Sequence, residues 1–506
     1  MKKTTGLLLG LMLIGAAAFA QNNTANLNQI NNYYGFGFIT QIGQDNMANV
    51  NQYNGLFLKG FINQLGKHNV ATTNQKFSLF SKAEIDQVGW GNNATINQTM
   101  DGWWFFPMPS DAKIVQKGMR LNATIDQTKS LADDADIMQY GRNNIATISQ
   151  TEDVADNALI TQFGRHNMAT ISQTLGGLST AVIMQVPNSK DNVATITQIG
   201  NMYVLGNIVQ QGKNNTATIG QTGSVYSTAN ILQANHRNVA TIDQTRAALS
   251  NADINQTGGH NTGTITQTMT FASAAAITQP GYFNNATISQ TNTVLSTASI
   301  TQPGWFNSAF IFQNSTDVHA NILQAGLFNT ASIKQHGKHL FATIDQLGWL
   351  NTATIDQNGK NHMAFIFQVG ILNNASITQT GGKWMAPNVA KIEQYGFFGV
   401  ATINQNGWGN QASITHPSMS WKATGTITQM GHMNEANLVQ MSNSTADINQ
   451  VGSHNLVTPA VIWFGNKLDV DQIGHFNKLT VMGTSVNSTM NVKQVGNWNV
   501  GIIVQH

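Results

Sequence analysis

The stretch ADIMQYGRNNIATISQ, residues 135–150, decides the fold because it spells one short pattern twice. The pattern Ala-x-Ile-x-Gln occupies residues 135–139 and returns at residues 146–150. Alternation with a period of two is typical of β-strands, and Ile and Thr favour them. Gly141 and the asparagines between the two runs favour a turn. The stretch therefore predicts a strand, a turn and a second strand.

The same pattern repeats through most of the chain. Glutamines in the Ile-x-Gln context follow one another at intervals of 11 or 12 residues, as at Gln139, Gln150, Gln162, Gln173 and Gln185. Alternate glutamines are followed by x-Gly-x-x-Asn, and the others by Thr and a variable polar run. One complete repeat spans 22 or 23 residues. About twenty such repeats lie between Gln41 and Gln494.

Two short strands joined by two turns form one coil of a β-solenoid. A single coil cannot bury its apolar residues, whereas stacked coils enclose a continuous core and pair each strand with its copies above and below. We therefore predict an all-β solenoid of about twenty rungs, a cross-β stack with two facing parallel sheets. The predicted core positions in and just after the decisive stretch are Ile137, Ala146, Ile148 and Ile171.

The glutamines share the inward parity of the isoleucines, so their amides should be buried. A buried amide without partners is costly, and a ladder in which each Gln bonds its copies in the adjacent rungs removes that cost. We expect the first Asn before each strand to form a similar ladder, and the repeat glycine to permit the sharp corner. The predicted ladder residues are Gln139, Asn144, Gln150, Gln162, Asn167, Gln173, Gln494 and Gln505, and the predicted turn residues are Gly141 and Gly164.

Composition narrows the classes of partner. Charged residues make up 9% of the chain, against about 25% in a typical soluble domain, and the formal net charge is +2. No dense run of Lys or Arg is present, so nothing predicts nucleic acid or an anionic membrane as the main partner. The chain has no Cys, which excludes disulfides and thiolate metal sites.

The first twenty residues predict export. They contain two lysines, an apolar run from Leu7 to Ile14 and the small-x-small end Ala18-Phe19-Ala20, as in a signal peptide cleaved before Gln21. No later segment offers about 18 consecutive apolar residues, so we expect no transmembrane segment. We divide the rest into an N-terminal segment, 21–40, and the repeat solenoid, 41–506, with loop insertions near 99–113, 380–391 and 416–428. The aromatic residues 103–106 of the first insertion belong either to a tolerated loop or to a contact site for a partner.

The pattern Ala-x-Ile-x-Gln-x-Gly-x-x-Asn-x-Ala-x-Ile-x-Gln of residues 135–150 closely resembles the curlin repeat of bacterial curli fibre subunits. The resemblance covers most of the chain, from about Gln41 to the C-terminus. It implies a secreted subunit that forms extracellular amyloid fibres on the cell surface of a Gram-negative-type bacterium, for biofilm matrix, adhesion and colonisation of host or abiotic surfaces. It also implies a curli-type secretion pore and a nucleator or major subunit as partners. Which of these two kinds of subunit the chain is stays open, because it has many more repeats than a typical curli subunit.

Assembly would proceed by templating. An uncovered terminal rung offers unpaired N–H and C=O groups, and another copy can add to it as a further strand pair. The first coils, around Gln29 and Gln41, and the last segment, MNVKQVGNWNVGIIVQH, have the pattern of ordinary rungs. We therefore expect Gln494 and Gln505 to lie at an assembly interface, with the chain itself as its main partner.

Other chemistry finds little support in the sequence. An enzyme needs convergent, non-repeated residues, and none is apparent, so we expect no catalytic activity, cofactor or metal site. Histidines recur at one corner, for example His68, His166 and His260, where exposed turn residues or a metal site are both conceivable. A monomeric surface-binding solenoid, ice-binding or adhesin-like, is the alternative, because outward threonines recur in a column: Thr147, Thr170, Thr195, Thr218, Thr241, Thr264 and Thr287.

Overall fold

A computed structural model describes residues 21–100, 109–383, 386–483 and 486–505 of the chain. The predicted signal peptide and the aromatic residues 103–106 lie outside this part. The chain divides into two compact units, Met1–Glu152 and Asp153–His506, which we describe one at a time. Strands and turns account for the described residues, with no helix among them, and they form a β-solenoid of about 20 turns. The prediction of an all-β solenoid is therefore confirmed.

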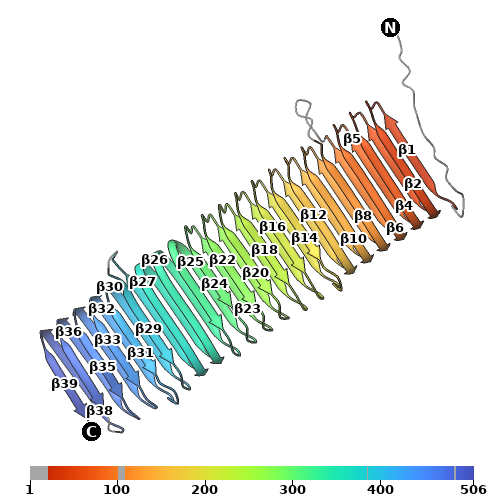
Figure 1. Cartoon of the computed structure of the whole chain (residues 1–506). Helices are drawn as coiled ribbons and strands as arrows, with labels where there is room; N and C mark the ends of the chain where they lie inside the picture. Colours follow the sequence, from red (N-terminus) through yellow and green to blue (C-terminus); the bar gives the residue numbers. More distant parts are fainter. Residues whose placement is uncertain (1–20, 101–108, 384–385, 484–485, 506) are drawn as a thin grey trace. The chain divides into compact units, whose positions relative to one another are not determined.

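The described part of the first unit contains eleven strands, some of which are labelled in Figure 1. Their bounds are β1 Thr24–Ile30, β2 Phe36–Gln44, β3 Met47–Tyr53, β4 Lys59–Lys67, β5 Val70–Lys76, β6 Lys82–Trp90, β7 Asn93–Thr99, β8 Asp111–Met119, β9 Asn122–Thr128, β10 Asp134–Arg142 and β11 Ile145–Thr151.

The second unit begins with short strands of the same kind and continues into three long ones. The first fifteen are β12 Asn157–Arg165, β13 Met168–Thr174, β14 Thr180–Gln185, β15 Val193–Ile199, β16 Leu205–Gln210, β17 Thr216–Thr222, β18 Thr228–Gln233, β19 Val239–Thr245, β20 Asn251–Gln256, β21 Thr262–Thr268, β22 Ala274–Gln279, β23 Asn285–Thr291, β24 Thr297–Thr301, β25 Ser308–Gln324 and β26 Thr330–Trp349. The others are β27 Thr352–Ile371, β28 Asn374–Gly381, β29 Asn388–Gln394, β30 Val400–Trp408, β31 Gln411–His416, β32 Thr424–His432, β33 Glu435–Gln440, β34 Thr445–Ser453, β35 Leu456–Ile462, β36 Lys467–His475, β37 Lys478–Gly483, β38 Thr489–Asn497 and β39 Val500–Gln505.

Within each unit, strands pair in parallel with the equivalent strand of the next coil. In the first unit, odd-numbered strands pair with odd-numbered ones and even-numbered with even-numbered ones, for example β8 with β10 and β9 with β11. The pairing is in register, so Ile137 lies opposite Ile114 and Gln139 opposite Gln116. In the second unit, β25, β26 and β27 each run through a corner and contribute to both ladders. Equivalent residues therefore form columns along each unit.

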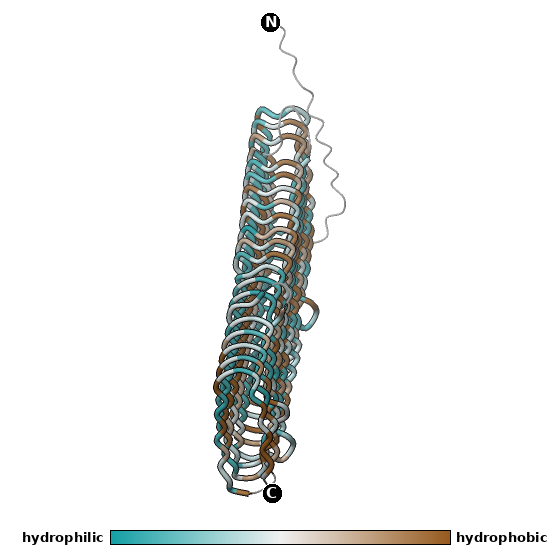
Figure 2. Tube along the Cα trace, turned by 90° about the vertical axis from the view of Figure 1, so that its left-hand side faces the viewer, coloured by the Kyte–Doolittle hydropathy of each residue, from teal (hydrophilic) through white to brown (hydrophobic). Residues whose placement is uncertain are grey.

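The core of each unit lies between its two ladders of strands. Ile137, Ile148 and Ile171 are 0% exposed, and Ala146 is 1% exposed. Burying an isoleucine side chain contributes roughly 1.5–3 kcal/mol, and most strands add one to the core. Figure 2 shows residues of similar hydropathy above one another in successive coils. The apolar column, repeated without interruption, is what makes stacking favourable.

The corners depend on glycine and on residues with positive φ. Gly141 and Gly164 have φ angles of +127° and +90°, which disfavour residues with a side chain. A Cβ atom added at Gly164 would lie 2.0 Å from the carbonyl oxygen of Ser189 in the next coil. At this position glycine is thus needed both for the turn and for the close approach of the neighbouring backbone.

The repeat extends further than the predicted domain boundaries and loops. Strand β1 and the start of β2 lie within residues 21–40, and β1 pairs in register with β3. At the predicted insertion near 380–391, β28 ends at Gly381 and β29 begins at Asn388. At the one near 416–428, β31 ends at His416 and β32 begins at Thr424. The inward Ala-x-Ile alternation resumes immediately after each corner, which leaves less room for loops than the broken spacing suggested.

Candidate functional site

The candidate functional site is the set of buried glutamine columns, together with the terminal coils where they end. In the first unit Gln139 accepts a hydrogen bond from Gln116 (2.9 Å), and Gln150 accepts one from Gln127 (2.9 Å). In the second unit Gln162 donates to Gln185 and Gln173 to Gln198, both at 2.8 Å. All four of the predicted glutamines among these are 0% exposed. The structure therefore places them in continuous amide ladders within each unit.

Each glutamine amide also bonds the backbone. The Nε2 group of Gln139 donates to the carbonyl oxygen of Asn122 (3.0 Å), and the Nε2 group of Gln116 donates to that of Asn93 (3.0 Å). Both N–H bonds of the amide are thus used inside the core. Each net hydrogen bond contributes about 1 kcal/mol, but an orphaned amide would cost more than that.

The ladders have one direction. In the Gln–Gln bonds of both units, Nε2 belongs to the earlier residue in the chain and Oε1 to the later one, from Gln29 to Gln52 (2.6 Å) in the first unit to Gln472 and Gln494 (2.7 Å) in the second. The described residues offer no donor to Oε1 of Gln29 or Gln41. Gln494, which is 8% exposed, donates only to the carbonyl oxygen of Lys478 (3.1 Å). In the first unit both ladders therefore begin with an acceptor, and in the second unit the ladder that contains Gln494 ends with a donor. The other ladder of the second unit ends earlier, at Gln440, which donates to the carbonyl oxygen of Thr424 (2.8 Å) and lies in register with Ile462.

The asparagines bond the corner backbone and, in several coils, also their own copies, as Asn69 does with Asn46 and Asn434 with Asn410 (both 3.1 Å). Oδ1 of Asn167 accepts the backbone N–H of Asn192 (3.1 Å), and its Nδ2 donates to Oγ of Ser189 (2.9 Å) and to the carbonyl oxygen of Phe163 (2.7 Å). Asn144 donates to the carbonyl oxygen of Tyr140 (3.4 Å). The asparagine side chain is one methylene shorter, so it reaches the corner backbone more readily than its own copy. It holds successive corners together.

His416 stands where the repeat calls for a glutamine, and the structure makes it a ladder residue, a role that the sequence did not predict. It lies in register with Gln394, and its ring is 0% exposed. Nδ1 lies 3.3 Å from Nε2 of Gln394, and Nε2 lies 3.0 Å from Oε1 of Gln440. Burial lowers the pKa of His416 to about 4, against the bond to Gln440, so the ring is neutral near pH 7. The intervals of 22 and 24 residues to the flanking glutamines were the available signal.

The terminal coils expose residues that interior coils bury. All seven residues of β1 are exposed, and Leu27, at an inward position, is 48% exposed. At the other end Ile503, which lies in register with the fully buried Val481, is partly exposed, and the outward residues Val500 and Ile502 are 73% and 72% exposed. The side chain of Gln505 lies outside the described part. Within that part, then, both ends present apolar residues and unpaired strand edges.

Corner aromatics stack from coil to coil, as at Trp498. Its ring lies 4.3 Å from that of Phe476, which lies 4.6 Å from His454. The histidines at this corner belong to the ring stack. In the described ranges, no three His, Asp or Glu side chains are grouped so as to hold a metal ion. Nor does any described helix have the length and apolar character needed to cross a membrane.

The outward threonines form an aligned column in the second unit. Thr170, Thr195 and Thr218 lie in register on β13, β15 and β17, and the column continues through Thr241 and Thr264. The outward column two residues later mixes Ser172, Thr197, Gly220, Asp243 and Thr266. The face is thus regular in geometry but mixed in chemistry.

One segment of the repeat is similar to a known protein family. Residues 351–381 match the family model of the curlin associated repeat. This segment comprises β27 and β28, which share the alternation, ladder glutamines and corner glycines of the other coils. No curated protein matches the chain. The match confirms the predicted resemblance: residues 351–381 of this chain are similar to the curlin associated repeat.

Proposed function

We propose that this chain is a secreted structural subunit without enzymatic activity, which polymerises end to end into extracellular curli-like amyloid fibres. The observation that carries the proposal is the single direction of the glutamine ladders, with Oε1 acceptors at Gln29 and Gln41 and a donor at Gln494. Two copies placed head to tail would continue the ladder. Two copies placed head to head would oppose like groups, so the fibre would be polar.

The exposed terminal coils support the same mode of growth. The inward residues Leu27, in the first coil, and Ile503, in the last, lose water when a further coil is added. The strand edges there gain backbone partners by strand addition. Export through a curli-type pore, partnership with a nucleator or major subunit, and roles in biofilm and adhesion to host or abiotic surfaces complete the proposal. These rest on the curlin-repeat match and on the predicted signal peptide.

A terminal substitution tests head-to-tail growth. The Q494E variant replaces the amide with a carboxylate, which has no N–H to donate to the acceptor of an incoming copy. Docking of that copy would also bury the negative charge. Added in small amounts to growing wild-type fibres, it should join at one end and stop further addition there, slowing growth at least tenfold. The N491D variant adds the same charge on the exposed face of β38 and should leave growth unchanged.

Thioflavin fluorescence and electron microscopy of the purified chain would follow the growth. Wild-type protein that stays monomeric at all concentrations would contradict the proposal outright. Equal slowing by Q494E and N491D would show that the ladder donor does not direct assembly.

The second candidate is a single rod that binds a surface through the aligned threonines. The in-register column from Thr170 to Thr264 is the observation that favours it. Measurement of thermal hysteresis on monomeric protein would test the ice-binding form. A freezing-point gap that disappears in a Thr218→Lys variant would support this function, and no gap would remove it.

A further inference from the structure

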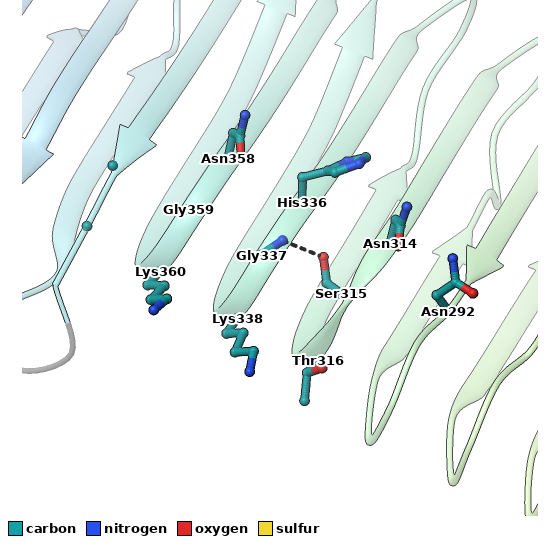
Figure 3. Close-up of a pocket in the computed structure, with 12 residues that line it drawn as sticks. Asn292, Asn314, Ser315, Thr316, His336, Gly337, Lys338, Asn358, Gly359 and Lys360 are labelled. Carbon is teal, nitrogen blue, oxygen red and sulfur yellow. Dashed lines mark hydrogen bonds between the residues drawn. The ribbon is translucent and has the colours of Figure 1, made fainter.

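A shallow polar groove crosses one corner of the second unit, where β25, β26, β27 and β28 lie side by side (Figure 3). Its volume is about 630 Å³. It forms where successive corners continue as in-register strands, so three columns of residues define its shape. The middle column is small: Ser315, Gly337, Gly359 and Gly381.

The two flanking columns are polar and provide hydrogen-bond donors. On one side lie Asn314, His336 and Asn358, in register on β25, β26 and β27. On the other side lie Thr316, Lys338 and Lys360. Figure 3 shows the two lysines projecting to the same side from adjacent strand ends. The small residues between the columns leave the backbone as the floor, and Gly337 donates to Oγ of Ser315 (2.9 Å).

Lys338 and Lys360 are stacked like charges without a balancing acid. They are in-register neighbours on adjacent strands, which lie about 4.8 Å apart. Like charges directly opposite one another on paired strands are destabilising. In the part of the chain that the structure describes, no carboxylate lies within 4.0 Å of either ammonium group, and the groove lining contains neither Asp nor Glu.

Nearby carboxylates have other partners. Asp317 is bonded to His339 (2.6 Å) and lies 3.5 Å from His319. Asp356 lies in register with Lys334, on the outward face of the strands that precede the corner. The positive charge of the lysine pair is therefore not neutralised within the coil stack.

Stacked lysines elsewhere in the chain differ in this respect. Lys59 and Lys82 are in register on β4 and β6, and Lys82 bonds Glu84 at 2.7 Å. Lys190 and Lys213 are in register at another corner, and Lys190 contacts Asp191 at 3.2 Å. In both pairs a carboxylate offsets the repulsion. Among the described residues, no carboxylate takes that place at Lys338 and Lys360.

We propose that this groove binds a phosphate-class oxyanion, held between the ammonium groups of Lys338 and Lys360 beside the small residues of the middle column. Two ammonium groups on adjacent strands match a dianion, which accepts charge-assisted hydrogen bonds from both. The glycine floor allows the ion to approach the backbone closely. The oxyanion is either a free ion or one group of an anionic polymer lying along the stack.

Calorimetric titration of the full chain at low ionic strength tests the site, with inorganic phosphate and tripolyphosphate as separate probes. Wild-type protein should bind at least one of them, and a K338Q/K360Q variant should bind it at least tenfold more weakly. Binding of inorganic phosphate indicates a free ion as ligand, whereas binding of tripolyphosphate alone indicates a polymer. If neither inorganic phosphate nor tripolyphosphate binds, the proposal is overturned.

Two control variants separate the groove from general charge. K59Q/K82Q removes an equal charge from a stacked pair that has its own carboxylate, and it should bind like wild type. K338R/K360R keeps both charges and should retain most of the affinity. Equal weakening in K59Q/K82Q, or loss of binding in K338R/K360R with an unchanged circular dichroism spectrum, would contradict a specific site.

Discussion

Nε2 of His416 lies 3.0 Å from Oε1 of Gln440, so a neutral imidazole occupies a glutamine position in a buried ladder. An amide oxygen only accepts, so Nε2 carries the proton and Nδ1 faces the amide of Gln394. The ring thus continues the donor-to-acceptor direction of its column. A second proton on Nδ1 would place two donors against each other.

The buried neutral ring of His416 predicts that the folded chain loses stability in acid. The pKa of His416 falls from 6.5 to about 4 on burial, so the unfolded chain binds a proton that the folded chain does not. Stability should be constant above pH 6.5 and decline as the pH falls towards 4, by about 3 kcal/mol in total. Urea unfolding at pH 7 and pH 4.5 would measure the loss, and H416Q should reduce it.

His362 provides a comparison within the same experiment. Its pKa is also lowered to about 4 by burial, but it lies at a corner outside the glutamine ladders. An H362N variant should remove a similar share of the pH dependence. If neither variant changes the slope between pH 7 and pH 4.5, the buried histidines are not its cause.

Removal of one interior ladder amide should be costly. Q290M keeps the length of the side chain but leaves the donor of Gln267 and the acceptor of Gln313 unpaired in the core. We expect a loss of about 2–4 kcal/mol in the free energy of unfolding. The S289M variant places the same side chain on the outward face of β23 and should change stability little. Similar losses in both would argue against the ladder as the source.

The corner glycines should differ in their tolerance of alanine. Gly164 and Gly200 both have positive φ, at +90° and +61°, but only Gly164 has backbone atoms within contact of an added Cβ. G200A should cost about 1 kcal/mol through conformation alone. G164A should cost more than about 3 kcal/mol, because a coil must also move away from Ser189. Thermal unfolding of the two variants would compare them, and equal costs would refute the role of close packing.

Asp136 should destabilise the first unit at neutral pH. Burial and the charge of Asp134 raise the pKa of Asp136 to about 6, so the folded chain binds a proton that the unfolded chain releases above pH 3.8. Stability should therefore fall as the pH rises from about 4 to 6 and then stay constant. D136N should raise the unfolding midpoint at pH 7 and leave it unchanged at pH 4. Solvent screening of the partly exposed carboxylate limits the size of the rise at pH 7.

A second aspartate provides the control for that experiment. Asp126 accepts a hydrogen bond from Nδ2 of Asn97 at 2.6 Å, so D126N removes a favourable acceptor. It should not stabilise the chain at pH 7. A rise in midpoint for both variants would indicate a general effect of negative charge.

The sequence predicted the strands, the buried glutamines and the corner glycines because the same residue types recur at equivalent positions in nearly every coil. Period-two alternation identifies the inward face, and a buried amide requires a partner in the next coil. The spacing does not contain the direction of the hydrogen bonds, because an amide can donate or accept either way. The bonding of Asn167 to the corner backbone also depends on atomic reach. His416 and the groove at Lys338 emerge only when residues one coil apart are brought into register.

The corners tolerate changes in chain length that the strands do not. Gln64 and Gln87 are 23 residues apart and Gln87 and Gln116 are 29 apart, yet both bonds measure 2.8 Å. Six extra residues therefore leave the amide contact unchanged. Foreign peptides of similar length could be grafted at such a corner, and polymerisation of the host would then display one copy for every subunit at regular intervals along a filament.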